Sequence, residues 1–161
     1  MPTLKHNRWI NAARPRSFPG LMALYESNYL RFERLVPELD LPFEHATSKG
    51  EDATLYLRVL ERCRYTTTIH LTYWFGQGEA RRADPDLRLR LYRDAELVEA
   101  ISCDERSRYV ALAGLPDIDD DVLNSQWPRN LLLNKWLAYC LAQGHSFGAA
   151  HRPRRGSDDL A

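Results

Sequence analysis

The central part of the chain alternates between apolar and polar side chains, the pattern of strands that bury one face and expose the other. The alternation predicts four strands over residues 53–62, 65–75, 87–92 and 95–103, and a fifth short strand over 109–113 is an alternative. The connections at Cys63–Arg64 and Arg93–Asp94 are short, which favours antiparallel hairpins. We therefore expect an antiparallel meander of four to five strands.

The same alternation gives the predicted strands an inner and an outer face. The side chains predicted to enter the core are Leu55, Leu57, Val59, Ile69, Leu71, Tyr73, Leu87, Leu89 and Leu91. The outer face carries basic and aromatic side chains, namely Tyr56, Arg58, His70, Trp74, Arg88, Arg90 and Tyr92. Glu61 and Glu99 share the parity of their apolar neighbours, which would point two carboxylates inward with Arg64 as a partner. Because strand ends often break parity, we favour an ordinary ion pair at the rim of the sheet.

Two segments have apolar residues at helical spacing, one on each side of the predicted strands. The first helix is expected over residues 19–36, with Ser17 as its cap and Pro19 in its first turn. Asn28 falls in its apolar stripe and is expected to point at the core or at a pocket. The second helix is expected over residues 129–143, and the segment around Ser48–Gly50 is expected to be a polar connection.

Together these elements predict an α+β fold in which an N-terminal and a C-terminal helix pack on one face of the meander. Residues 17–147 are expected to form a single domain, since no linker rich in glycine, proline or serine divides them. Residues 1–16 are predicted to be a flexible basic arm, and residues 148–161 a disordered tail.

The composition excludes several classes of protein. The chain of 161 residues has 22 basic and 22 acidic side chains, so no global field attracts nucleic acid. No apolar run approaches the length that crosses a bilayer, and the basic N-terminus lacks the apolar stretch of a signal peptide. Three scattered cysteines do not form a disulfide framework. We expect a cytoplasmic protein that does not bind membranes.

No motif in the chain specifies a catalytic, metal or cofactor site. Residues 117–121 resemble the start of a calcium loop, but Val122 and Pro128 occupy positions that such a loop gives to glycine and glutamate. The five histidines lack metal-ligand spacing, and phosphate-binding and nucleophile motifs are absent. The sequence therefore predicts no catalytic residue, no metal and no cofactor.

The order and spacing of several short pieces carry a resemblance to a known family. These pieces are Phe18–Pro19, Leu24, Glu26 and Asn28–Tyr29, then Glu61, Arg64–Thr67, Arg90–Tyr92, Asp94–Ala95 and Glu99, and finally Trp136–Leu137, Tyr139–Ala142 and Gly144. Over residues 16–147 the chain resembles the YqiB-like bacterial proteins, domain of unknown function 1249. The resemblance implies a one-domain cytosolic protein without an established activity.

The resemblance directs attention to polar residues that match the family and away from His70, Trp74 and Arg58, which do not. The candidate binding residues are Glu26, Asn28, Arg64, Tyr65, Arg90, Tyr92, Asp94 and Glu99. The leading hypothesis is a non-enzymatic binding or regulatory module that acts through a protein partner or by self-association. One alternative is a binding protein or enzyme for an anionic or nucleotide-like small molecule, clamped by Arg64 and Arg90. A further alternative is RNA binding by the outer face of the sheet, although the neutral charge makes nucleic acid an unfavoured partner.

Overall fold

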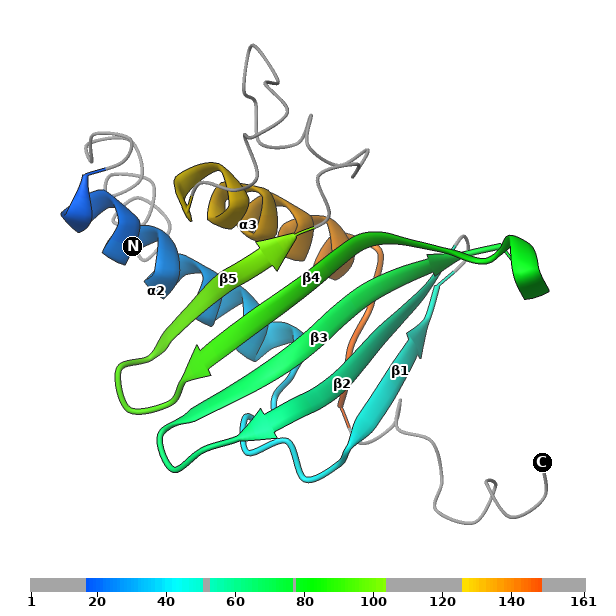
Figure 1. Cartoon of the computed structure of the whole chain (residues 1–161), viewed down its shortest axis with the longest axis horizontal. Helices are drawn as coiled ribbons and strands as arrows, with labels where there is room; N and C mark the ends of the chain where they lie inside the picture. Colours follow the sequence, from blue (N-terminus) through cyan, green and yellow to red (C-terminus); the bar gives the residue numbers. More distant parts are fainter. Residues whose placement is uncertain (1–16, 51–52, 77, 104–125, 149–161) are drawn as a thin grey trace.

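A computed structural model describes residues 17–50, 53–76, 78–103 and 126–148, which form two helices and a five-stranded antiparallel sheet (Figure 1). The helices are α2, Phe18–Leu35, and α3, Gln126–Ala142. The strands are β1, His45–Lys49; β2, Thr54–Arg62; β3, Thr66–Phe75; β4, Arg82–Tyr92; and β5, Leu97–Cys103. A short 3₁₀ helix, η1, spans Gly78–Ala80. The sheet order is β1-β2-β3-β4-β5, so the predicted α+β meander is confirmed.

The predicted arm, the predicted tail beyond residue 148 and the alternative strand over 109–113 lie outside the described residues. Within the described parts, α2 begins at Phe18 because Ser17 caps it, its Oγ accepting a hydrogen bond from the Gly20 amide at 3.1 Å. Helix α3 begins at Gln126, three residues before the predicted start.

Two predictions about the loops are wrong. The segment around Ser48 is not a connection but strand β1, which pairs with β2 in the register Ala46 to Leu57 and Ser48 to Leu55. Only two small side chains of this strand, Ala46 and Ser48, are buried, so its sequence carries a weak alternation. Strand β4 begins at Arg82 and includes Asp84–Pro85, which we predicted to lie in a loop.

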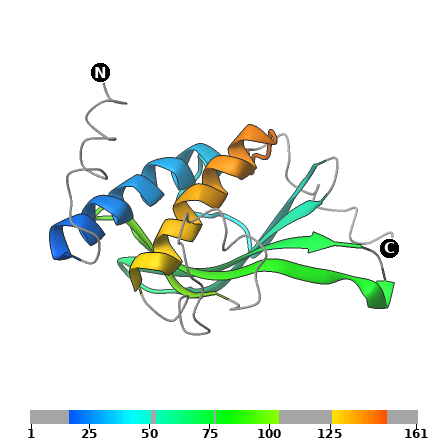
Figure 2. The same cartoon turned by 90° about the horizontal axis from the view of Figure 1, so that it is seen from above.

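Both helices pack on the same face of the sheet, as predicted (Figure 2). All nine side chains predicted for the inner face are buried there. They meet an apolar stripe from the helices, which includes Phe32, Leu133, Trp136 and Leu137, each 0% exposed. Removing this apolar surface from water is the main favourable contribution to folding. No helix of the described residues lies over the opposite face of the sheet.

In the part of the chain that the structure describes, side chains of the helices, and not another strand, bond to the outer edge of β5. Asn130 of α3 pairs with the Ala100 backbone as a neighbouring strand would: its Oδ1 accepts from the amide at 2.6 Å and its Nδ2 donates to the carbonyl at 3.3 Å. Asn28 of α2 donates to the Val98 carbonyl at 3.3 Å, and Arg129 donates to the Ala100 carbonyl at 2.8 Å. Since an exposed strand edge invites further pairing, these contacts both satisfy the edge and dock the helices.

We expect Asn130→Ala to lower the free energy of unfolding by about 2–3 kcal/mol, because it leaves the buried Ala100 amide without its acceptor. The measurement is urea unfolding followed by circular dichroism. Lys135→Ala, at an exposed position of the same helix, is the matched control and should change stability by no more than about 0.5 kcal/mol. Equal changes in the free energy of unfolding for Asn130→Ala and Lys135→Ala would show that the Asn130 side chain does not hold the β5 edge.

Candidate functional site

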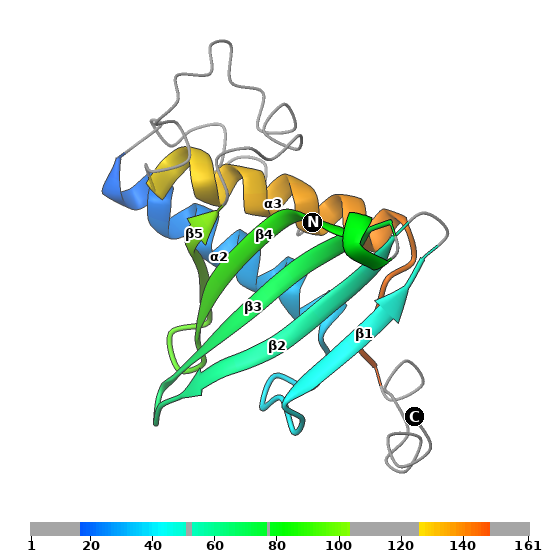
Figure 3. The ribbon, with the colours of Figure 1, turned by 45° about the vertical axis from the view of Figure 1, so that its right-hand side comes forward.

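The open face of the sheet carries a row of four basic side chains, one from each of four neighbouring strands. The register places His45 of β1 opposite Arg58 of β2, Arg58 opposite His70 of β3, and His70 opposite Arg88 of β4. We call these four residues the basic row. Figure 3 shows the strands that carry it, with both helices behind the sheet. Residues directly opposite each other have Cβ atoms about 5 Å apart, so their charges interact.

Rows of other chemistry border the basic row on both sides. On one side the register places Thr47, Tyr56, Thr72 and Asp86 across β1 to β4. On the other side it places Glu61, Thr68, Arg90 and Glu99 across β2 to β5. The basic row is therefore a single narrow band of positive charge with carboxylates on each flank.

A hollow of about 670 Å³ opens over β1, β2 and β3 on this face. Its lining contains Thr47, Thr54, Tyr56, Arg58, His70, Trp74, Gly76, Gly78 and Arg81. At one end the Arg81 guanidinium lies over the Trp74 ring, 4.1 Å from its centroid, which stabilises both side chains by a cation–π contact. At the other end are Arg58 and His70 of the basic row. The volume suits one small ligand, because pockets for such ligands enclose roughly 300–1,000 Å³.

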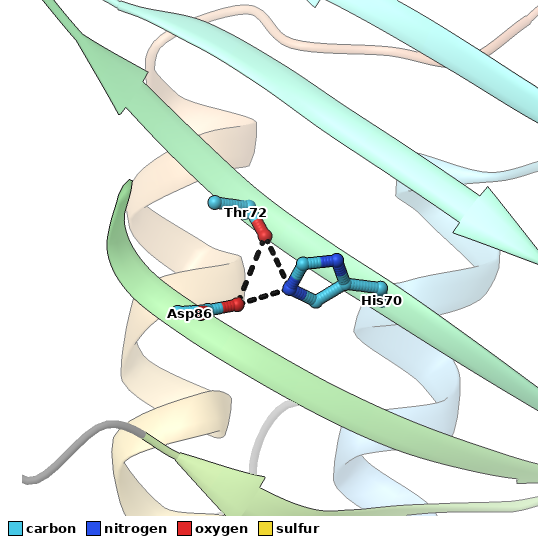
Figure 4. Close-up of polar contacts among 3 residues, drawn as sticks. All are labelled: His70, Thr72 and Asp86. Atoms are coloured by element: carbon cyan, nitrogen blue, oxygen red, sulfur yellow. Dashed lines mark hydrogen bonds and ion pairs between the residues drawn. The ribbon is translucent and has the colours of Figure 1, made fainter. Parts of the chain in front are cut away.

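The imidazole of His70 is held by two side chains of the neighbouring row (Figure 4). Its Nε2 contacts the Asp86 carboxylate, and the Thr72 hydroxyl lies 2.9 Å from the same nitrogen. Thr72 also donates to Asp86 at 3.3 Å, so the three groups form a closed triangle. Asp86 thereby orients the ring and favours a proton on Nε2. Among the described residues no group contacts Nδ1, which Figure 4 shows turned away from Asp86.

A second polar cluster connects α2 with strands β4 and β5 on the open face. Glu99 accepts hydrogen bonds from the phenols of Tyr25, at 3.1 Å, and Tyr92, at 2.8 Å. Burial raises the pKa of Tyr25 far above its usual range, and the adjacent Glu99 adds to the rise. Burial also raises the pKa of Tyr92, while the hydrogen bond with Tyr92 raises the pKa of Arg90. The cluster keeps both phenols protonated and fixes the carboxylate, which is the behaviour of a structural anchor.

A third cluster is buried beneath the sheet. The Nδ1 of His145 lies 2.9 Å from the Ser48 hydroxyl, and its Nε2 contacts the Tyr73 hydroxyl. The three side chains are each less than 5% exposed, so solvent and ligands do not reach them. The Ser48 hydroxyl also accepts from the Ser146 amide at 3.2 Å. This cluster ties the segment after α3 to β1 and is not a nucleophilic site.

The structure brings together three of the eight candidate residues from the sequence and separates the others. Arg90, Tyr92 and Glu99 form the anchor described above. Asn28 is buried at the β5 edge, behind the sheet. Arg64 and Tyr65 stack on each other in the β2–β3 turn, with the guanidinium 5.2 Å from the ring centroid. Asp94 is exposed in the β4–β5 turn, and Glu26 is half-buried on α2.

Neither Glu61 nor Glu99 points inward, although parity alone would place both carboxylates there. Val98 and Ala100 are the buried residues of β5, so Glu99 between them lies on the open face, opposite Arg90. Parity failed because Leu97 is an apolar residue on the open face, opposite Tyr92, and because the pairing becomes irregular beyond Ala100, at Ile101. Glu61 is exposed because a bulge between Val59 and Glu61 shifts the register at the end of β2.

The lining of the hollow was only partly accessible to sequence reasoning. Alternation along β2 and β3 places Tyr56, Arg58, His70 and Trp74 on the outer face, as predicted. Thr47 was missed because β1 was not predicted, and Arg81 because it lies in the turn between η1 and β4. The alternation of Ala46 and Ser48 was the one available signal for Thr47.

Neither helix combines the length and apolar character needed to cross a membrane, among the residues that the structure describes. Within those same ranges, no group of three or more His, Cys, Asp or Glu side chains is placed to hold a metal ion.

Fold and site define an α+β protein whose antiparallel sheet is covered by two helices on one face and presents a basic row and a hollow on the other. Comparison with known proteins places the chain in a family: residues 31–146 match the model for "Protein of unknown function (DUF1249)", and the chain belongs to that family. The chain is 31% identical over 134 residues to the uncharacterized protein YqiB of Escherichia coli K12, covering 79% of this chain and 90% of that protein. The YqiB proteins of E. coli O6:H1 and O157:H7 give the same identity and coverage. No solved structure matches the chain.

The raised pKa of Tyr25 predicts a specific dependence of stability on pH. The unfolded chain ionises this phenol near pH 10, whereas the folded protein holds it protonated, so the stability that the phenol contributes is complete below pH 10 and declines above it. At pH 8 we expect Tyr25→Phe to be about 1 kcal/mol less stable than the wild type. At pH 11 the wild type should have lost about 1.4 kcal/mol relative to the variant, so Tyr25→Phe should then be the more stable of the two by about 0.4 kcal/mol.

The measurement is the free energy of urea unfolding of both proteins at pH 8 and pH 11. Tyr65→Phe is the control, because Tyr65 is an exposed phenol in the β2–β3 turn. Its difference from the wild type should stay constant over the same range. A constant difference for Tyr25→Phe would mean that Tyr25 ionises normally in the folded state.

Proposed function

We propose that the protein is a binding module that recognises an anionic ligand on the open face of its sheet. The observation that carries the proposal is the basic row. Like charges directly opposite each other on neighbouring strands destabilise a sheet. The row places His45 and His70 directly opposite Arg58 or Arg88, so each histidine that carries a proton is repelled by a neighbouring arginine, and a bound anion relieves this repulsion.

The charges of the row are only partly matched within the chain. Asp86 contacts His70, as described above, but no hydrogen bond or ion pair joins Arg58 or Arg88 to any described residue. Both arginines are exposed, so their guanidinium donors are available in a geometry that suits carboxylate and phosphate groups. The neutral net charge of the chain makes this band a local feature rather than part of a general basic surface.

The basic row also bears on the hypotheses drawn from the sequence. An anionic small molecule is favoured because the hollow adjoins the row. A protein partner or a second copy of the chain would need a narrow row of acidic side chains to match the basic row. No feature of the open face favours a partner of that shape. In this proposal Arg58 and Arg88 bind the anion, whereas the hypothesis drawn from the sequence gave this role to Arg64 and Arg90. The cytoplasm stays our prediction for where the module acts.

We expect inorganic pyrophosphate to bind the wild type and to raise its melting temperature, and Arg58→Gln to weaken this binding at least about fivefold, since a charge-assisted contact is lost. Without ligand, Arg58→Gln should be as stable as the wild type or more stable by about 0.5 kcal/mol, because repulsion in the row is relieved. The measurements are isothermal titration calorimetry and thermal unfolding at low ionic strength.

Arg34→Gln is the matched control, because Arg34 is an exposed arginine in the last turn of α2. It should leave pyrophosphate binding unchanged. Absence of pyrophosphate binding to the wild type, or equal weakening by the two substitutions, would contradict the proposal.

A further inference from the structure

We infer that the ligand of the open face is a small molecule in which a flat unsaturated ring is joined to a negatively charged group. The ring packs in the hollow against Tyr56 and Trp74, and the charged group reaches the basic row at Arg58. The inference rests on the proposed function and names the chemical class of its ligand.

The layout of β2 and β3 brings the two recognition elements within the span of one small molecule. Tyr56 and Arg58 are two residues apart on β2, so they lie on the same face about 6.6 Å from each other along the strand. Trp74 lies farther along the hollow on β3, opposite Thr54 of β2. The hollow is thus aromatic toward Trp74 and cationic toward Arg58 and His70.

The aromatic side chains of the hollow are pre-arranged as flat surfaces. Trp74 is half-buried and held by the Arg81 guanidinium over its ring. Tyr56 is also half-buried and lies nearly parallel to the His45 ring, with an interplanar angle of 24° and centroids 6.2 Å apart. Half-buried aromatic rings that line a hollow retain apolar surface in contact with water, and a flat ligand ring stacked on them removes it.

Polar groups line both ends of the hollow: Arg81 and Thr54 lie beside Trp74, and Arg58 and His70 lie at the opposite end. Arg58 presents unpaired donors, and the His70 ring is fixed there by Asp86 and Thr72. A few oriented polar groups beside an apolar wall are the usual composition of a small-molecule site. Gly76 and Gly78 form part of the lining near Trp74, where the absence of side chains keeps this end open.

The charge pattern favours a small molecule over a single strand of RNA. A polynucleotide needs a continuous basic track for its successive phosphates. Here Asp86 borders the basic row on one flank, and on the other flank the next basic side chain, Arg90, is accompanied by Glu61 and Glu99. A second and third phosphate would meet carboxylates.

The test is a calorimetric titration of the full chain with two sets of probes. The first set is adenosine monophosphate, adenosine and inorganic phosphate; the second is benzoate, benzyl alcohol and acetate. In at least one set, we expect the molecule with both ring and charge to bind about tenfold more tightly than either fragment. Trp74→Leu should weaken binding of that molecule about tenfold and leave the affinity for pyrophosphate unchanged. Tyr65→Leu replaces an exposed ring outside the hollow and should change neither of these two affinities.

Tyr56→Leu is a second variant that tests the same wall if Trp74→Leu fails to fold, and circular dichroism checks both. If pyrophosphate binds but neither ring-bearing anion exceeds its fragments, the inference is overturned while the proposed function stands. If pyrophosphate does not bind either, both are overturned. If a single-stranded oligoadenylate binds more tightly than adenosine monophosphate, and its affinity falls steeply as salt is added, the ligand is RNA and the inference of a small molecule is overturned.

Discussion

Two asparagines hold the helices of this protein against the last strand of its sheet. Asn130 pairs with the backbone of Ala100, and Asn28 reaches the carbonyl of Val98, so the edge of β5 is satisfied by side chains from α3 and α2. This contact sets the position of both helices relative to the sheet. Because both lie on one face, neither described helix covers the other face of the sheet, where the basic row and the hollow lie.

The basic side chains on that open face are placed where they can bind an anion, although this placement does not stabilise the sheet. Regular strand pairing forces His45, Arg58, His70 and Arg88 into one row, whereas evenly mixed charges would stabilise the same sheet. Of the nearby carboxylates, Glu99 accepts from Tyr25 and Tyr92, and Asp86 contacts only His70 of the row, so among the described residues neither carboxylate pairs with Arg58 or Arg88. Proteins commonly retain such local conflicts where they bind a ligand. The hollow beside the row adds the aromatic wall that a simple anion site would lack.

Much of the fold was predictable from the sequence, because burying one face imposes a strict alternation on long strands. Ile69 and Leu71 in β3, and Leu87 to Leu91 in β4, follow it without exception. Strand β1 was not predictable, since its buried residues are only alanine and serine. Its pairing with β2 is local, but the partner of its buried Ser48 is His145, far along the chain. Parity also placed Arg58, His70 and Trp74 on one face, but their union in a hollow depends on β1 and Arg81. Asn28 was recognised as a polar residue in an apolar stripe, whereas its partners across the fold were not.

The central claim is that an anion binds the open face of the sheet at the basic row. It is tested most directly by two-dimensional nuclear magnetic resonance of the isotope-labelled protein during addition of pyrophosphate, observing backbone amides and the arginine side-chain Nε–H groups. The account predicts that the Nε–H signals of Arg58 and Arg88 shift most, together with amides of β2, β3 and β4 in the row, while signals of α2 and α3 stay in place. Shifts concentrated on the helices, or no shifts at all, would contradict it.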